Sequence, residues 1–537
     1  MRRDKHIAAM QGGRQFDLLV IGGGATGCGI ALDAATRGLT TALVERADFA
    51  EGTSSRSTKL VHGGVRYLEM AVRQLDRGQY NLVRDALLER FRLLHNAPHL
   101  TRRVTLLTPL FKWLEVPYVW SGLKLYDVLA GRHNIGPSQL VGREELLTAC
   151  PLLRREGLKA GVRYYDGQFL DARMALDLAL TAAENGAAVA NHVSALEFIK
   201  HGGRVTGAVL RDELSGEQWS LQARQVINAT GPFVDEMRRL DEPDCPEILA
   251  VSSGVHLILP GRFIPPGGGL MIPKTEDGRI LFVLPWQGHA LVGTTDEPAK
   301  VEPHPRPREE EIAYLLRHLR RYLDADIDEQ DVTATWCGLR PLVHEPSAKD
   351  TARLSRDHVL TVSRSGLLTI AGGKWTTYRR MAEDAVDRAV ELAGLQPKQP
   401  CRTKDLVLLG GRQLQADAVQ QLQKEFALAP ETAAHLAEAY GDRAAAVAAL
   451  TEDVGSKSLH SDFPYLEAEV VYAARHELAE RLYDTLAHRL PLAFLNRQAA
   501  TEVTERALTL LAAEKGWDDD RCKIEREIMA ERLDVAL

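Results

Sequence analysis

The sequence predicts an α/β protein with three parts: a parallel α/β domain assembled from separate stretches of chain, an antiparallel β-sheet domain and an α-helical C-terminal domain. A strand, a glycine turn and a helix follow one another near the start, and the same order returns at 367–376. Between Gly254 and Asp296, short apolar runs alternate with turn signals, as in an antiparallel sheet. Residues 397–537 carry apolar side chains at helical spacing.

Length and composition indicate an ordered protein of several domains. A chain of 537 residues exceeds what one hydrophobic core supports, and about three domains are expected. Hydrophobic residues make up 45% and charged residues 26%, both ordinary for folded proteins. The net charge of -7 argues against nucleic acid as a partner.

Cysteine usage points to a reducing compartment, and hydropathy gives no sign of a secretory signal or a membrane span. The six cysteines are scattered without CxxC pairs, so neither a disulfide framework nor a metal site is expected. The first 15 residues lack the apolar core of a secretory signal, and no run of about 18 apolar residues suggests a membrane span. Any membrane contact is expected to be peripheral.

The first glycine turn predicts a Rossmann-like site for an adenine dinucleotide. An apolar strand at 18–21 is followed by Gly22, Gly24 and Gly27 at G-x-G-x-x-G spacing and then by a helix. These glycines permit a tight turn and a close approach of backbone to a pyrophosphate at the helix N-terminus. A second strand at 41–44 ends in Glu45, placed to accept hydrogen bonds from a ribose hydroxyl. At this point NAD and FAD are equally good candidates.

A run of hydroxyl residues follows the second strand. Thr53, Ser54 and Ser55 are predicted to contact the cofactor, because the loop after this strand lies at the ligand-binding edge of such a sheet. A solvated loop is the alternative. His62-Gly63-Gly64 comes next and leads into Arg66 and Tyr67.

Two later strand ends extend the predicted cofactor site. An apolar strand ends in Ala229, Thr230 and Gly231, and the strand at 367–370 leads through Gly372, Gly373 and Lys374 into a helix from about Thr376; these seven positions are predicted to bind the cofactor. A cofactor contacted by so many remote segments is long and firmly held, which favours FAD over an exchanging NAD.

Several ordered motifs resemble one flavoenzyme family. The segment TSSRSTKLVHGGVRYLE after the glycine turn is similar to the FAD-dependent, quinone-linked glycerol-3-phosphate dehydrogenases, and five later motifs agree in the same order: INATGPFVDE, GVHLILP, LPWQGHALVGTTD, CGLRPLV and AGGKWTTYRRMAEDAVD. The resemblance is strong over 15–390. It implies FAD as cofactor, a sheet roofing the flavin, and oxidation of sn-glycerol 3-phosphate to dihydroxyacetone phosphate in glycerol metabolism.

The expected domains follow from these assignments. The FAD-binding domain is predicted to comprise 15–95, 160–250 and 345–395, the substrate domain 96–159 and 251–344, and the helical domain 396–537. The helical domain shows no catalytic constellation, so a structural role, a homodimer contact or a partner contact is expected there.

The substrate residues are assigned largely by resemblance. Arg66 and Arg340 are expected to clamp the substrate phosphate, with Tyr67 beside them, because arginine matches phosphate oxygens bidentately. His256, in the strand 254–260, is the expected base, although strand histidines are usually structural. Lys374 is expected to stabilise negative charge on the substrate or on the flavin. All four charged residues are therefore predicted to be catalytic.

The electron acceptor is the least determined feature. Family members reduce a membrane quinone or molecular oxygen; quinone is favoured because no extra oxidase segment is identified. The aromatic and basic stretch 110–127 is then expected to contact the bilayer, with a buried packing role as the alternative. The predicted location is cytoplasmic, at the cytoplasmic face of the inner membrane. A glycerol-3-phosphate oxidase, an amine oxidase and a non-enzymatic FAD-binding interaction protein are the other hypotheses.

Overall fold

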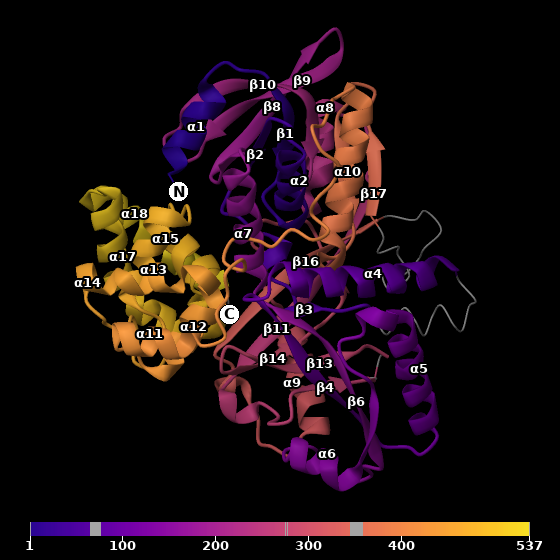
Figure 1. Cartoon of the computed structure of the whole chain (residues 1–537). Helices are drawn as coiled ribbons and strands as arrows, with labels where there is room; N and C mark the ends of the chain where they lie inside the picture. Colours follow the sequence, from indigo (N-terminus) through magenta and orange to yellow (C-terminus); the bar gives the residue numbers. More distant parts are fainter. Residues whose placement is uncertain (1, 65–76, 274, 277, 344–357, 536–537) are drawn as a thin grey trace.

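Two sheets and a helical region make up the chain (Figure 1). The computed structural model describes residues 2–64, 77–273, 275–276, 278–343 and 358–535. The two sheets meet near the middle of the molecule, and the C-terminal helices pack beside both of them (Figure 1). The predicted α/β fold class, with a helical C-terminal region, is confirmed.

The first sheet holds the predicted Rossmann-like unit. Its order is β17-β18-β10-β1-β2-β7, parallel except for β17, with the β8–β9 hairpin extending from β10. The strands are β1 (Phe16–Ile21), β2 (Thr41–Val44), β7 (Ala188–Ala190), β8 (Val193–His201), β9 (Arg204–Asp212), β10 (Gln218–Asn228), β17 (His358–Val362) and β18 (Leu368–Gly372). The three expected segments of the discontinuous unit therefore share one sheet.

Both faces of this sheet are covered, which explains the unbroken apolar run of β1. Leu18 and Val20 pack into the core formed with the helices on one face, whereas Leu19 and Ile21 pack into a core shared with α1, β8 and β9 on the other. The helices of this part are α1 (Arg3–Gln11), α2 (Ala25–Thr36), α4 (Arg77–Asn96), α7 (Asp171–Glu184), α8 (Val234–Asp241) and α10 (Tyr378–Ala393).

The second sheet is largely antiparallel, as predicted. Its main path is β15-β11-β14-β13-β12-β4-β6-β3, with β16 paired to β11 and β5 to β6. The strands are β3 (Leu60–Val61), β4 (Thr101–Leu110), β5 (Gln139–Gly142), β6 (Ala160–Phe169), β11 (Leu249–Leu259), β12 (Gly269–Ile272), β13 (Leu281–Trp286), β14 (His289–Gly293), β15 (Glu297–Pro298) and β16 (Ala334–Val343). Helices α5 (Glu115–Ala130), α6 (Arg143–Ala149) and α9 (Glu309–Tyr322) belong to this part.

Residues with positive φ lie in the connections of two hairpins of this sheet. Gln287 and Gly288, both with positive φ, form a two-residue turn between β13 and β14. Gly278, with φ of 81°, lies between β12 and β13.

The strand pairing differs from the predicted domain boundaries at two places. β3 and β6 pair with each other and β6 pairs with β4, so both lie in the second sheet. The sequence boundaries had placed residues 60–61 and 160–169 in the FAD-binding part. Local pattern cannot reveal this, because the sheet that a strand joins is decided by partners that are remote in sequence.

The C-terminal region is helical, as predicted. Its helices are α11 (Ala418–Phe426), α12 (Pro430–Tyr440), α13 (Ala444–Ala449), α14 (Thr451–Val454), α15 (Glu467–His476), α16 (Leu492–Leu495), α17 (Arg497–Lys515) and α18 (Asp519–Val535). The helical pattern of this region is interrupted after α15. The chain leaves α15 at His476, passes through Leu478 with φ of 55°, and forms a separate π-helical turn, η9 (Asp484–Arg489).

Candidate functional site

A cavity of about 970 Å³ opens at the carboxyl ends of β1, β2, β10 and β18. Ligands of open parallel sheets bind at this edge. Beyond the first sheet, the cavity wall includes residues of β11 and β16 and also side chains from α18. The site therefore joins all three parts of the fold, and its size suits a dinucleotide together with a small substrate.

The glycine turn leaves no room for side chains. Gly22 has φ of 113°, and a Cβ on it would lie 2.5 Å from the carbonyl oxygen of Ala229. A Cβ on Gly27 would lie 1.8 Å from the carbonyl oxygen of Gly22. Gly24 is the N-cap of α2, where free N–H groups favour a pyrophosphate. Gly22 and Gly24 line the cavity, whereas Gly27 packs behind the turn.

Glu45 stands at the predicted end of β2 and lines the cavity. Its carboxylate accepts hydrogen bonds from the backbone N–H groups of Gly23, at 2.6 Å, and Ala47, at 2.9 Å. These bonds join the glycine turn to the start of the following loop and fix where the carboxylate lies.

The hydroxyl loop reaches the cavity through two of its three predicted residues. Thr53 and Ser54 line it, and the Ser54 hydroxyl accepts a hydrogen bond from the N–H of Ala25 at the start of α2. Ser55 does not line it: the side chain is fully buried and faces a smaller space against the C-terminal region. The three residues form the short helical turn η1 (Thr53–Ser55), in which the first two residues line the cavity and the third does not.

The last predicted cofactor segments line the same cavity. Ala229, Thr230 and Gly231 line the cavity, and so do Gly372, Gly373, Lys374 and Thr376. The turn η7 (Trp375–Thr377) is tied to the other wall, because the Trp375 indole donates to the carbonyl oxygen of Ser54 at 2.8 Å.

His256 and Arg340 come together from adjacent strands. His256 of β11 pairs in register with Trp336 of β16, and its ring stacks on that indole with centroids 5.3 Å apart. Its Nε2 lies 2.9 Å from the hydroxyl oxygen of Thr58. Burial lowers the pKa of His256 well below its usual value, and the positive charges of Arg340 and Lys59 lower it further. The imidazole is therefore neutral at pH 7.

Arg340 is held firmly at the cavity wall. Its guanidinium donates to the carbonyl oxygens of Ser253 and Thr295 and to the hydroxyl of Thr294, each at 2.9 Å. It also pairs with Asp296 at 3.2 Å. These contacts orient the cationic group in advance.

Two glycines make the space for these side chains. A Cβ on Gly254 would lie 2.3 Å from an Arg340 guanidinium nitrogen, and one on Gly293 would lie 2.2 Å from the His256 ring. The strand motif containing Gly254 thus serves the site as well as the sheet.

Two predicted site residues fall outside the described residues, and one wall of the cavity was not predicted from the sequence. Arg66 and Tyr67, the second half of the predicted phosphate clamp, fall outside the described residues. The wall formed by Ile528, Glu531 and Arg532 of α18 had no local signal, because those residues look like an ordinary charged helix.

One buried trio has the spacing of a metal site. Ligand atoms of Asp48, His192 and Asp484 lie within 4.8 Å of one another. Asp48, however, already pairs with Arg489. Burial lowers the pKa of His192, but Asp484 outweighs burial and raises it above its usual value. His192 and Asp484 pair with each other at 2.8 Å, so we interpret the trio as part of an ion-pair cluster.

The family comparisons agree with this geometry. A family model described as FAD dependent oxidoreductase matches residues 17–379, and a second, the C-terminal domain of alpha-glycerophosphate oxidase, matches 401–522. The class of protein is therefore an FAD-dependent oxidoreductase: an enzyme that binds FAD.

Individual relatives narrow the class. Mitochondrial glycerol-3-phosphate dehydrogenase of Homo sapiens is 46% identical over 531 residues, covering 96% of this chain and 73% of the relative. The probable mitochondrial enzyme of Caenorhabditis elegans is 47% identical, covering 96% and 73%. The crystal structure of glycerol-3-phosphate dehydrogenase from Bacillus halodurans complexed with FAD has 31% identity and a TM-score of 0.82, covering 99% of this chain and 97% of that one. The chain belongs to the FAD-dependent glycerol-3-phosphate dehydrogenase family.

Proposed function

We propose that this enzyme oxidises sn-glycerol 3-phosphate to dihydroxyacetone phosphate and passes the electrons to a membrane quinone. The observation that carries the proposal is the pairing of a neutral, buried His256 with a pre-oriented Arg340 in the wall of the FAD cavity. The names of the relatives support the same substrate.

The reaction divides between the cofactor and the protein. The alcohol loses a hydride from carbon and a proton from oxygen, and bound FAD supplies the acceptor for the hydride. His256 takes the proton, because its lowered pKa leaves the imidazole unprotonated. Lys374, in the cavity wall, stabilises the negative charge that develops there.

The substrate phosphate requires cationic groups inside the cavity. Arg340 supplies a fixed positive charge at the cavity wall, because its terminal nitrogens are held by protein oxygens. Its anchoring by Ser253, Thr294 and Asp296 reduces the entropy lost when a phosphate binds. Arg66 and Tyr67 complete this proposed clamp on the basis of the sequence motif.

The proposed quinone acceptor is supported by an exposed aromatic surface on and before α5. Trp113 is 66% exposed and Leu114 88% exposed, and Tyr118 and Trp120 are also exposed. Leu123, Tyr126 and Ala130 of the same helix are buried and hold it to the body of the protein. This surface supports the bilayer-contact hypothesis over the buried-packing alternative.

The proposed membrane contact is peripheral. Among the described residues, no helix combines the length and hydrophobicity needed to cross a bilayer. We propose attachment at the cytoplasmic face of the inner membrane. The proposed homodimer is a separate prediction that sedimentation velocity would test.

Anaerobic reduction tests the substrate. Adding sn-glycerol 3-phosphate to the oxygen-free holoenzyme should bleach the visible absorbance of the flavin, because hydride transfer requires no further acceptor. A flavin that stays oxidised would overturn the proposed reaction and leave the non-enzymatic hypothesis. Bleaching by N-methyl amino acids instead would identify an amine oxidase.

The acceptor is tested in the same preparation. The enzyme should reduce a soluble quinone analogue faster than it consumes oxygen. Stoichiometric hydrogen peroxide without quinone reduction would identify a glycerol-3-phosphate oxidase, a possibility that the oxidase name of the matched C-terminal model keeps open.

A further inference from the structure

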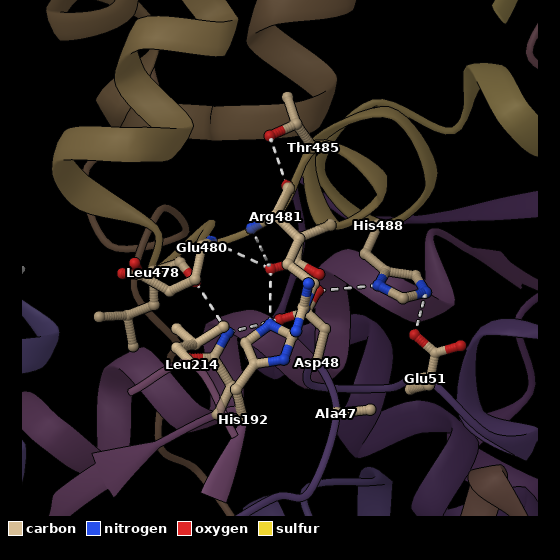
Figure 2. Close-up of polar contacts among 12 residues, drawn as sticks. Ala47, Asp48, Glu51, His192, Leu214, Leu478, Glu480, Arg481, Thr485 and His488 are labelled. Carbon is tan, nitrogen blue, oxygen red and sulfur yellow. Dashed lines mark hydrogen bonds and ion pairs between the residues drawn. The ribbon is translucent and has the colours of Figure 1, made fainter. Parts of the chain in front are cut away.

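The loop between β2 and β3 is held from outside by the C-terminal region. Its inner side lines the cavity through Glu45, Gly52, Thr53 and Ser54. Two acidic residues of the same loop, Asp48 and Glu51, pair with the C-terminal region (Figure 2), and Glu51 also lines the cavity. The positions of the cofactor-lining residues therefore depend on contacts that this loop makes with the C-terminal region.

Asp48 is fully buried and bound on several sides. It accepts hydrogen bonds from both terminal guanidinium nitrogens of Arg489, the longer at 3.0 Å. The amide of Asn191 donates to it at 2.9 Å, and Nδ1 of His488 lies 2.8 Å away. Arg489 and His488 both belong to η9, so this turn is docked on the start of the loop.

Glu51 is held by the last helix of the chain. The Arg532 guanidinium of α18 pairs with its carboxylate, and Arg56 of the loop itself lies 3.4 Å away. His488 lies between the two acidic residues, with its Nε2 3.8 Å from Glu51 (Figure 2). Burial alone would raise the pKa of Glu51, but Arg532, His488 and Arg56 together outweigh burial and lower the pKa to about 2. The carboxylate is therefore charged at pH 7.

Arg532 is itself fixed and faces the cofactor cavity. Its guanidinium lies 4.0 Å from the centre of the Tyr483 ring, a cation–π contact within the C-terminal region. Arg532, Glu531, Ile528 and Tyr483 line the same cavity as Glu45 and Thr53. The loop and the helix are thus two walls of one site, joined by the Glu51–Arg532 pair.

We propose that Arg532 is a positioning residue for FAD, and that α18 closes the cofactor site by fixing the loop 45–56 through Glu51. The C-terminal region then sets FAD affinity, in addition to any structural or partner role. The inference rests on FAD binding and needs neither the substrate nor the acceptor proposed above.

The test compares two arginines of α18. Arg532→Met removes the pair with Glu51. Arg526→Met, also in α18, removes an exposed pair with Glu505 of α17. For each full-length variant, the apoprotein is prepared and the dissociation constant for FAD is measured by quenching of flavin fluorescence. Arg532→Met should raise it roughly tenfold or more, and Arg526→Met should change it less than about twofold, as expected for an exposed ion pair.

Two further measurements separate positioning from general stability. Glu51→Gln should weaken FAD binding to a similar extent, and the double variant should be no weaker than the worse single variant, because both changes break one interaction. Hydrogen exchange in the Arg532→Met holoprotein should rise at 47–56 and stay unchanged in α2. Arg532→Lys, which keeps the charge, replaces Arg532→Met if that variant does not fold, and should show a smaller loss of affinity.

The proposal fails if folded Arg532 variants bind FAD as tightly as the wild type. It also fails if the effects of Glu51→Gln and Arg532→Met add fully, since the two residues would then act independently. A loss of affinity equal in the Arg526 and Arg532 variants would show a nonspecific effect of altering α18 and would equally overturn it.

Discussion

At the scale of single residues, the site depends on side chains whose charge state is set by burial. His256 is almost completely buried, stacked on Trp336 and near the cations Arg340 and Lys59. Burial and the two cations each disfavour the protonated ring. Gly254 and Gly293 contribute by leaving the space into which the two functional side chains fit. The glycines of these strands are therefore required by the side chains packed against them.

Replacing His256 with asparagine should reduce kcat at least about a hundredfold, because positioned proton transfer contributes that much. His318→Asn is the matched control: His318 is equally buried in the same part of the fold but does not line the cavity. Single-turnover flavin reduction by sn-glycerol 3-phosphate measures the effect. A loss below about tenfold would show that His256 is not the base.

The lowered pKa also fixes a pH dependence. As pH falls from about 8 to about 6.5, protonation of His256 should not lower kcat/KM, because the imidazole stays deprotonated over this range. An unperturbed histidine would lose half of its basic form at about 6.5. An inflection near pH 6.5 that disappears in His256→Asn would contradict the shifted pKa.

At the scale of elements, α5 packs against the protein with one side and exposes aromatic residues on the other. Leu123 and Tyr126 pack inward, and the Tyr126 hydroxyl accepts a hydrogen bond from the N–H of Gly63 at 2.7 Å. The opposite side presents Tyr118 and Trp120, and the segment before the helix presents Trp113. Exposed aromatic rings of this kind favour the interfacial layer of a bilayer.

Changing Trp113, Tyr118 and Trp120 together to alanine should reduce sedimentation with liposomes containing anionic lipid severalfold, because interfacial binding scales with the apolar area inserted. Flavin reduction by substrate should be unaffected. Leu414→Ala, an exposed apolar residue in the C-terminal region, is the control. Unchanged sedimentation of the triple variant would exclude this surface as the membrane contact.

At the scale of the whole molecule, the cavity draws its walls from residues as distant as Ile21 and Arg532. Both sheets and the C-terminal region thus contribute to the walls of one cavity. Binding to the folded state alone stabilises it by mass action. FAD is therefore expected to act as a structural link between the parts of the chain.

Free FAD at a hundred times its dissociation constant should stabilise the apoprotein by about 2.7 kcal/mol. Thermal unfolding followed by circular dichroism, with and without FAD, measures the shift. FAD should also slow hydrogen exchange in peptides of the first sheet and in peptides of the C-terminal helices to a similar extent. Slower exchange in the first sheet alone would show that FAD does not stabilise the C-terminal region.

The sequence alone determined the local units and the cofactor. The order of strand, glycine turn, helix and terminal acid at 16–45 predicts its own conformation, because the spacing of apolar residues and glycines lies within this one segment. The hydroxyl loop and the glycine turns at 231 and 372 were also recognisable. Fold class, FAD binding and family all follow from such short-range signals.

Only the tertiary structure decided which remote groups share the site. β3 and β6 join the second sheet, Ser55 turns away from the cavity, and Arg532 enters its wall. None of these has a local signature, because a buried ion pair such as Glu51–Arg532 forms between segments that each look like ordinary surface sequence. Packing brings them together, and the low-dielectric interior then gives their charges a role that the sequence does not show.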